Sequence, residues 1–161
     1  MAIPLHFCAA MPSELAPDFF SVDLEGRPTH VYNERAFRYF LSNELKRSER
    51  TGRPFALLLL EWNGQVRQRT SMDSELATRL FSGLSLCLRE TDFVGWYQEG
   101  TVAAAVLTHL GDTSGADISL QIRRRFSQVA FTGLLPEIAE EFALRVFQLP
   151  AQELELGENR R

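Results

Sequence analysis

One pair of charged residues has side chains suited to binding chemistry. Arg89 and Asp92, three positions apart, combine a guanidinium that donates paired hydrogen bonds with a carboxylate that only accepts them. The same two residues can instead form a local ion pair, because arginine at a helix end and aspartate in the following turn are both common.

The other nucleophilic and metal-ligating residues form no recognisable motif. The two cysteines, Cys8 and Cys87, have no CxxC or Cys/His spacing and predict neither a disulfide nor a zinc site. The histidines, His6, His30 and His109, share no ligand or catalytic spacing. There is no Gly-x-Ser-x-Gly sequence and no phosphate-binding glycine loop. We therefore predict no cofactor and no bound metal.

Composition limits the class of protein. A chain of 161 residues that is 45% hydrophobic can bury an independent core as a single domain. With 17 basic and 21 acidic residues, its net charge of -4 argues against broad binding of nucleic acid or anionic membranes. No apolar run is longer than the one over 55–60, which is too short to cross a bilayer, and the N-terminus lacks the features of a secretory signal. We predict a cytoplasmic protein with no membrane insertion.

Hydrophobic periodicity predicts the elements that must position these residues. In order, they are a helix from 33 to the turn at 51–54, a strand over 55–60, a helix over 73–89, strands over 92–97 and 101–107 joined by a hairpin, a helix from 113 or 114 that includes 118–129, and a strand over 142–149. The strand over 55–60 is apolar throughout, which is typical of a strand covered on both faces. This order predicts an α/β fold with a mixed central sheet and flanking helices.

The two ends of the chain differ from this central pattern. Residues 1–28 contain four prolines and no helical period, and we predict an N-terminal arm or extension. The arm could pack on its own domain, swap between protomers or dock on a partner. Residues 29–150 form the predicted domain, and 151–161 form a flexible polar tail.

Several short patterns, in one order, resemble the GGDEF domain of diguanylate cyclases. Residues 33–37 look like that family's Asn-Arg-Arg-x-Phe helix opening, and 50–60 resemble its Arg-x-Gly-Arg-Pro turn into an aliphatic strand. Residues 89–92 match its Arg-x-x-Asp motif, and 93–97 supply the family's spacing to the hairpin tip. The resemblance covers 29–149 and implies a nucleotide-cyclase palm fold that lacks the family's last helix.

The catalytic positions of that family are occupied by other residue types. Carboxylates at the end of its first strand and at the hairpin tip hold two divalent cations. Glu61 and Asn63 stand here where the family has two aspartates, and Gln98-Glu99-Gly100-Thr101-Val102 replaces Gly-Gly-Asp-Glu-Phe. In an ungapped alignment Gly100 and Thr101 take the acidic positions, and neither replaces a carboxylate ligand. The resemblance therefore implies a catalytically inactive domain.

Two further departures from the family's sequence argue against catalysis, whereas one alternative alignment is compatible with it. Gln98 and Glu99 stand where the family's glycines let the backbone approach the substrate. Residues 64–73 retain none of the family's substrate-positioning elements. A one-residue shift of the alignment would place Glu99 opposite Glu61, which leaves room for one cation.

The Arg-x-x-Asp motif carries a different implication. In active relatives it forms the inhibitory site that holds cyclic di-GMP, so Arg89 and Asp92 imply a receptor for this dinucleotide. Another arginine normally completes the site, and Arg123, Arg124 and Arg125 are candidates, although such arginines more often form a solvated helix face than a ligand site.

Three hypotheses follow from the sequence. The first is an inactive GGDEF-like regulatory or scaffold domain that contacts a protein partner in bacterial signalling. The second is a cyclic di-GMP receptor that uses Arg89 and Asp92. The third is a divergent nucleotide cyclase that uses Glu61 and Glu99. A homodimer is compatible with each of them.

Overall fold

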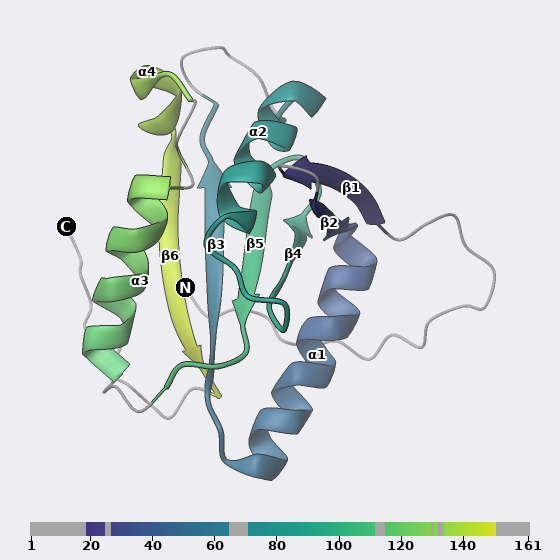
Figure 1. Cartoon of the computed structure of the whole chain (residues 1–161), viewed down its shortest axis with the longest axis vertical. Helices are drawn as coiled ribbons and strands as arrows, with labels where there is room; N and C mark the ends of the chain where they lie inside the picture. The colour runs from purple at the N-terminus through teal and green to yellow at the C-terminus, as the bar shows by residue number, and fades with distance from the viewer. Residues whose placement is uncertain are drawn as a thin grey trace.

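The fold is a single mixed sheet with helices on both faces (Figure 1). The computed structural model describes residues 19–24, 27–64, 71–111, 115–129, 131 and 134–150. Its elements are β1 (Phe19–Leu24), β2 (Arg27–Tyr32), α1 (Glu34–Thr51), β3 (Phe55–Trp62), α2 (Ser74–Ser85), β4 (Phe93–Gln98), β5 (Val102–Leu107), α3 (Gly115–Val129), α4 (Pro136–Ala139) and β6 (Phe142–Leu149). No helix in these ranges is long and apolar enough to span a membrane.

The strands are arranged in the order β1-β2-β4-β5-β3-β6. β2 runs parallel to β4, and all the other neighbouring strands are antiparallel. From β3 onward, and apart from the short α4, the chain follows the β-α-β-β-α-β order in which one strand is inserted between the two strands of a β-α-β unit. The predicted mixed sheet with flanking helices is confirmed.

β3 supplies side chains to two separate cores. Leu58 and Leu60 point to the face covered by α2 and α3, whereas Leu57 and Leu59 point to the face covered by α1. This split follows from the pleat of a strand, in which successive side chains alternate between faces. All residues from Phe55 to Leu60 are buried, as expected of a strand covered on both sides.

Capping residues begin or end two of the helices at the positions that the sequence predicts. The Asn33 side chain accepts a hydrogen bond from the Ala36 amide at 2.8 Å, and Asp73 does the same for the Leu76 amide. Gly52, with φ at 69°, ends α1 in the left-handed conformation. The predicted beginning of each of these two helices is therefore confirmed.

α2 ends earlier than its leucine spacing predicts. The helix stops at Ser85 rather than at Arg89, and the amides of Cys87 and Leu88 donate hydrogen bonds to carbonyls three residues back, as in a tightening turn. Leu86 is 53% exposed at this turn. The four-residue spacing of the leucines continues past the end of the helix because Leu88, in the turn, also packs against the core.

The sequence pattern does not predict the strands β1 and β2. They form an antiparallel hairpin that joins the sheet through the pairing of β2 with β4, and β2 crosses the boundary predicted at residue 28. The short α4 was also not predicted. The predictions for 1–18 within the arm and for the polar tail over 151–161 lie outside the described residues.

Gly95 allows β2 to approach β4. A Cβ atom at this position would lie 2.6 Å from the Tyr32 carbonyl oxygen and 2.9 Å from Cδ2 of the Phe37 ring. Both contacts are too short for non-bonded atoms, and Phe37 is fully buried in the core beneath α1. A residue without a side chain is therefore required where β2 and α1 meet β4.

Replacement of this glycine tests the docking of β2. We expect Gly95→Ala to lower the free energy of unfolding by about 1–3 kcal/mol, because the added methyl group forces β2 or α1 outward. Urea denaturation measures the change, and Gln98→Ala, at the exposed end of the same strand, is the matched control. Equal unfolding midpoints for the two variants would contradict the close packing at Gly95.

Candidate functional site

The end of β3 and the β4–β5 hairpin tip lie together, as the sequence predicts. The Trp62 amide donates a hydrogen bond to the Thr101 carbonyl at 2.9 Å, which joins the end of β3 to the tip. The Asn63 amide donates to the Glu141 carbonyl at 3.0 Å, and the Asn63 side chain is exposed. The backbone at this end of the sheet is thus held by hydrogen bonds from both sides.

The hairpin tip is a tight turn with exposed polar side chains. Gln98 and Glu99 are exposed, and the Thr101 amide donates to the Gln98 carbonyl at 3.1 Å. Gly100 has φ at 77°, a conformation that favours glycine over an acidic residue. The Thr101 hydroxyl is buried and has no hydrogen-bond partner within the described ranges. Gly100 and Thr101 therefore present no carboxylate at the turn.

The start of α1 holds the tip in place through a cluster that sequence analysis missed. The Glu99 amide donates to a carboxylate oxygen of Glu34 at 2.8 Å, and Glu34 also pairs with Arg38 at 2.9 Å. Arg38 donates through Nε to the Tyr97 carbonyl at 2.9 Å, and its guanidinium lies 4.9 Å from the centre of the Tyr97 ring. Burial raises the pKa of the Tyr97 hydroxyl, and the Arg38 charge opposes that rise.

Glu61, the carboxylate at the end of β3, is already paired with a cation. Its Oε2 atom lies 2.9 Å from a guanidinium nitrogen of Arg145 on β6, and each side chain is 43% exposed. The pairing of β3 with β6 accounts for this contact, because Glu61 lies opposite Ala143, two residues from Arg145. A divalent cation at Glu61 would have to displace or share the carboxylate with a positive charge.

The residues at this end of the sheet do not fit a two-cation centre. Asn63 is exposed and neutral, Gly100 and Thr101 supply no carboxylate, and Glu61 is engaged with Arg145. Within the part of the chain that the structure describes, no group of three or more His, Cys, Asp or Glu residues could hold a metal ion. Of Glu61, Asn63, Gly100 and Thr101, Glu61 alone can supply the carboxylate oxygens that hard cations prefer.

Asp92, in the Arg-x-x-Asp motif, binds the backbone. Its Oδ2 atom accepts a hydrogen bond from the Arg89 amide at 2.9 Å, and Oδ1 accepts from the Thr108 amide at 2.9 Å. The Thr108 hydroxyl also donates to Oδ1 at 3.3 Å. The carboxylate therefore joins the turn after α2 to the end of β5, and its contact with Arg89 is to the main chain.

The Arg89 side chain is exposed and lines two adjacent depressions. The first, of about 160 Å³, also includes Cys87, His109 and Arg125, and the second, of about 480 Å³, includes His109 and Arg47. Burial raises the pKa of the Cys87 thiol, and the hydrogen-bonded Arg125 guanidinium opposes this only in part. Cys87 is therefore a weak nucleophile at neutral pH.

Of the three arginines on α3, the structure brings Arg125 to Arg89. Arg123 and Arg124, two of the three candidates from the sequence, are exposed and line neither depression. His109, for which the sequence predicts no role, lines both depressions. The hairpin register could have located it, because the start of β4 lies opposite the end of β5 and brings 108–110 beside 89–92.

Comparison with known proteins identifies the fold. The sequence matches no family model, and no curated protein is significantly similar to it. Among solved structures, the GGDEF domain of TpbB (YfiN) from Pseudomonas aeruginosa has a TM-score of 0.52 at 20% identity, covering 74% of this chain and 71% of that one. A sensory box/GGDEF family protein from Caulobacter crescentus has a TM-score of 0.54 at 14% identity, with coverages of 76% and 81%.

A third solved structure has the same fold and a bound ligand. The GGDEF domain of DgcB from Caulobacter crescentus, in complex with c-di-GMP, has a TM-score of 0.50 at 11% identity, covering 86% of this chain and 80% of that one. The chain thus has the fold of GGDEF domains, which confirms at the level of fold the resemblance found in the sequence.

The two residues of the Arg-x-x-Asp motif are expected to differ in their contribution to stability. Asp92→Ala should lower the free energy of unfolding by about 1–3 kcal/mol, because it removes the acceptor from two backbone amides. Arg89→Ala, the matched control, should change it by less than about 0.5 kcal/mol, because the side chain is exposed. Chemical denaturation followed by tryptophan fluorescence measures the free energy of unfolding of both variants. Equal decreases would contradict the conclusion that Asp92 stabilises the fold by accepting hydrogen bonds from backbone amides.

Proposed function

We propose that this chain is a catalytically inactive GGDEF-like domain that regulates or scaffolds a bacterial signalling process through protein contacts. The fold supplies the class of domain. The observation that carries the proposal is the Glu61–Arg145 ion pair, which places a positive charge beside the carboxylate at the end of β3.

The chemistry of phosphoryl transfer supports inactivity. Attack on a nucleoside triphosphate needs cations that bridge phosphate oxygens and stabilise the developing charge. A positive guanidinium at 2.9 Å from Glu61 lowers the affinity of that carboxylate for a cation, and the tip offers Gly100 and Thr101 in place of acidic ligands. The remaining function of such a domain is to bind, either to a protein or to a small ligand.

An assay with nucleoside triphosphates tests the loss of catalysis. We expect no cyclic dinucleotide or cyclic mononucleotide and no pyrophosphate from GTP or ATP with Mg²⁺ or Mn²⁺, either for the wild type or for Arg145→Ala, in which Glu61 is freed. An active diguanylate cyclase serves as the positive control. Product that forms with the wild type and disappears in Glu61→Gln would overturn the proposal and favour the divergent cyclase.

A second function, a receptor for cyclic di-GMP, is supported by the cationic surface at Arg89. Arg89 and Arg125 line one depression, and two guanidiniums suit the phosphates or guanine edges of a dinucleotide. The Asp92 carboxylate already accepts hydrogen bonds from the backbone, which weakens the part of this hypothesis that depends on it. The GGDEF domain of DgcB, solved with c-di-GMP, makes this dinucleotide the ligand to test.

Calorimetric titration with cyclic di-GMP distinguishes the receptor from a purely protein-binding domain. If the receptor function holds, Arg89→Ala and Arg125→Ala should each weaken binding about tenfold or more, because each removes a charge-assisted contact. Arg123→Ala and Arg124→Ala are the matched controls on the same helix and should bind as the wild type does. The absence of heat at high micromolar ligand would exclude the receptor.

A further inference from the structure

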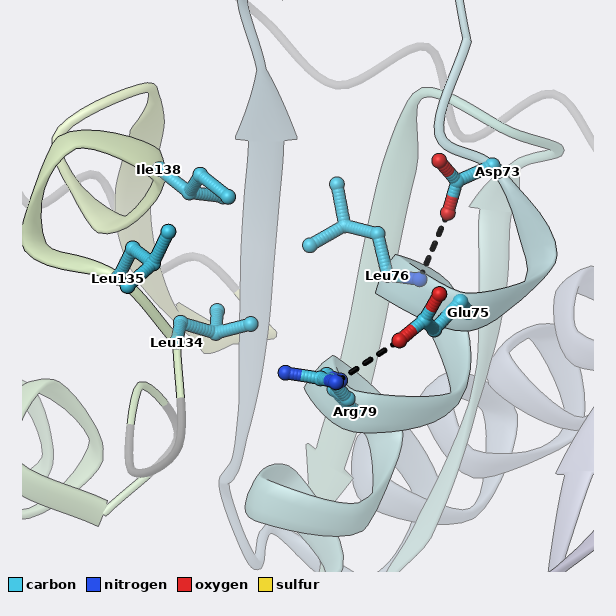
Figure 2. Close-up of a pocket in the computed structure, with 7 residues that line it drawn as sticks. All are labelled: Asp73, Glu75, Leu76, Arg79, Leu134, Leu135 and Ile138. Atoms are coloured by element: carbon cyan, nitrogen blue, oxygen red, sulfur yellow. Dashed lines mark hydrogen bonds and ion pairs between the residues drawn. The ribbon is translucent and has the colours of Figure 1, made fainter.

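A small apolar groove lies between the start of α2 and the segment that contains α4 (Figure 2). Its volume is about 190 Å³, and Leu76 on α2 faces Leu134, Leu135 and Ile138 across it. Leu135 is 60% exposed, more than the other large hydrophobic side chains in the described ranges. Cavities for drug-sized ligands usually exceed about 300 Å³, so this groove suits one or two side chains of a protein partner.

Carboxylates outnumber cations around this groove. Asp73 and Glu75 line it together with Arg79, and Figure 2 shows Arg79 turned toward Glu75, with which it pairs at 2.8 Å. Glu137, on the short helix that supplies Ile138, and Glu140, directly after that helix, are exposed and add negative charge to the segment without lining the groove. The carboxylates at this groove are called its acidic surround. An apolar groove with such a surround favours a partner surface on which positive charges accompany an apolar side chain.

The outer face of α3 offers that combination. Leu120 is 50% exposed on this helix, and the exposed Arg123 and Arg124 follow it three and four positions later. On a helix, residues at these spacings lie beside one another on the same face. Leu120, Arg123 and Arg124 together are called the α3 face. None of these three residues lines the groove or either of the two depressions beside Arg89.

We propose that a second copy of this chain docks the α3 face into the groove of the first copy. Leu120 of one copy would contact Leu135 and Ile138 of the other, and the two arginines would lie against the acidic surround. The two surfaces are different parts of the chain, so the contact is head-to-tail rather than symmetric. Each pair leaves one groove and one α3 face free, and further copies can add in a chain or close a ring.

This inference is independent of whether the domain has lost catalysis. It names one protein contact that such a domain could make, and its failure would leave the inactive-domain proposal untouched. Because the groove is small, we expect a weak contact that forms at high local concentration, with an association that falls as salt screens the charges.

Sedimentation velocity on two variants tests the head-to-tail contact. Leu135→Asp impairs the groove and keeps the α3 face, whereas Leu120→Asp impairs the α3 face and keeps the groove. We expect the wild type to associate reversibly between about 10 and 500 µM and each variant alone to remain a monomer. An equimolar mixture of the two variants should form a one-to-one dimer that grows no further, because only one intact groove meets one intact α3 face.

Two controls separate this result from misfolding or general stickiness. Leu86→Asp replaces an exposed leucine outside both surfaces and should associate as the wild type does. The double variant Arg123→Glu/Arg124→Glu changes only exposed charges and should weaken association at least about tenfold.

Three outcomes would overturn the proposal. A wild type that stays monomeric throughout the concentration range has no such contact. A mixture of the two variants that stays monomeric, with both variants folded by circular dichroism, excludes pairing of groove and α3 face. The third outcome is a monomeric protein whose melting temperature is lowered by Leu135→Asp and not by Leu120→Asp. That result would indicate that another segment of the same chain occupies the groove.

Discussion

The burial of β3 on both faces is the constraint on which the rest of the structure depends. Its residues Phe55 to Leu60 are all buried, and they alternate between the core beneath α1 and the core beneath α2 and α3. A strand without access to water must also pair its backbone groups on both edges, and β5 and β6 supply those partners. The helices and the two neighbouring strands are thus arranged around one segment of chain.

The same constraint determines the chemistry at the end of β3. Pairing with β6 brings Arg145 to Glu61, and the chain that enters β6 brings the buried Glu141 within 2.9 Å of the Trp62 indole nitrogen. These contacts join β3 to β6 at the end of the sheet that also carries the β4–β5 hairpin tip. Carboxylates that accept hydrogen bonds or ion pairs within the fold stabilise it and are less available to a cation.

The opposite end of the sheet divides the Arg-x-x-Asp motif into two roles. The Asp92 carboxylate holds the turn after α2 against Thr108, while the Arg89 side chain extends to solvent beside Arg125 and His109. A motif that looks like one binding unit in the sequence therefore serves structure with one residue and leaves the other available for a ligand.

Local signals in the sequence determined the central strand, the last strand, the hairpin and the beginnings of two helices. Asn33, Gly52 and Asp73 act within a few residues of their own position, and the apolar run of β3 reports its burial directly, so each could be recognised without knowledge of the fold. Only the tertiary structure decided that β1 and β2 extend the sheet, that Arg145 pairs with Glu61, and that Arg125 is the arginine beside Arg89. Those contacts join segments distant in the chain, and their partners depend on strand order and register, which the spacing of residues along one segment does not contain.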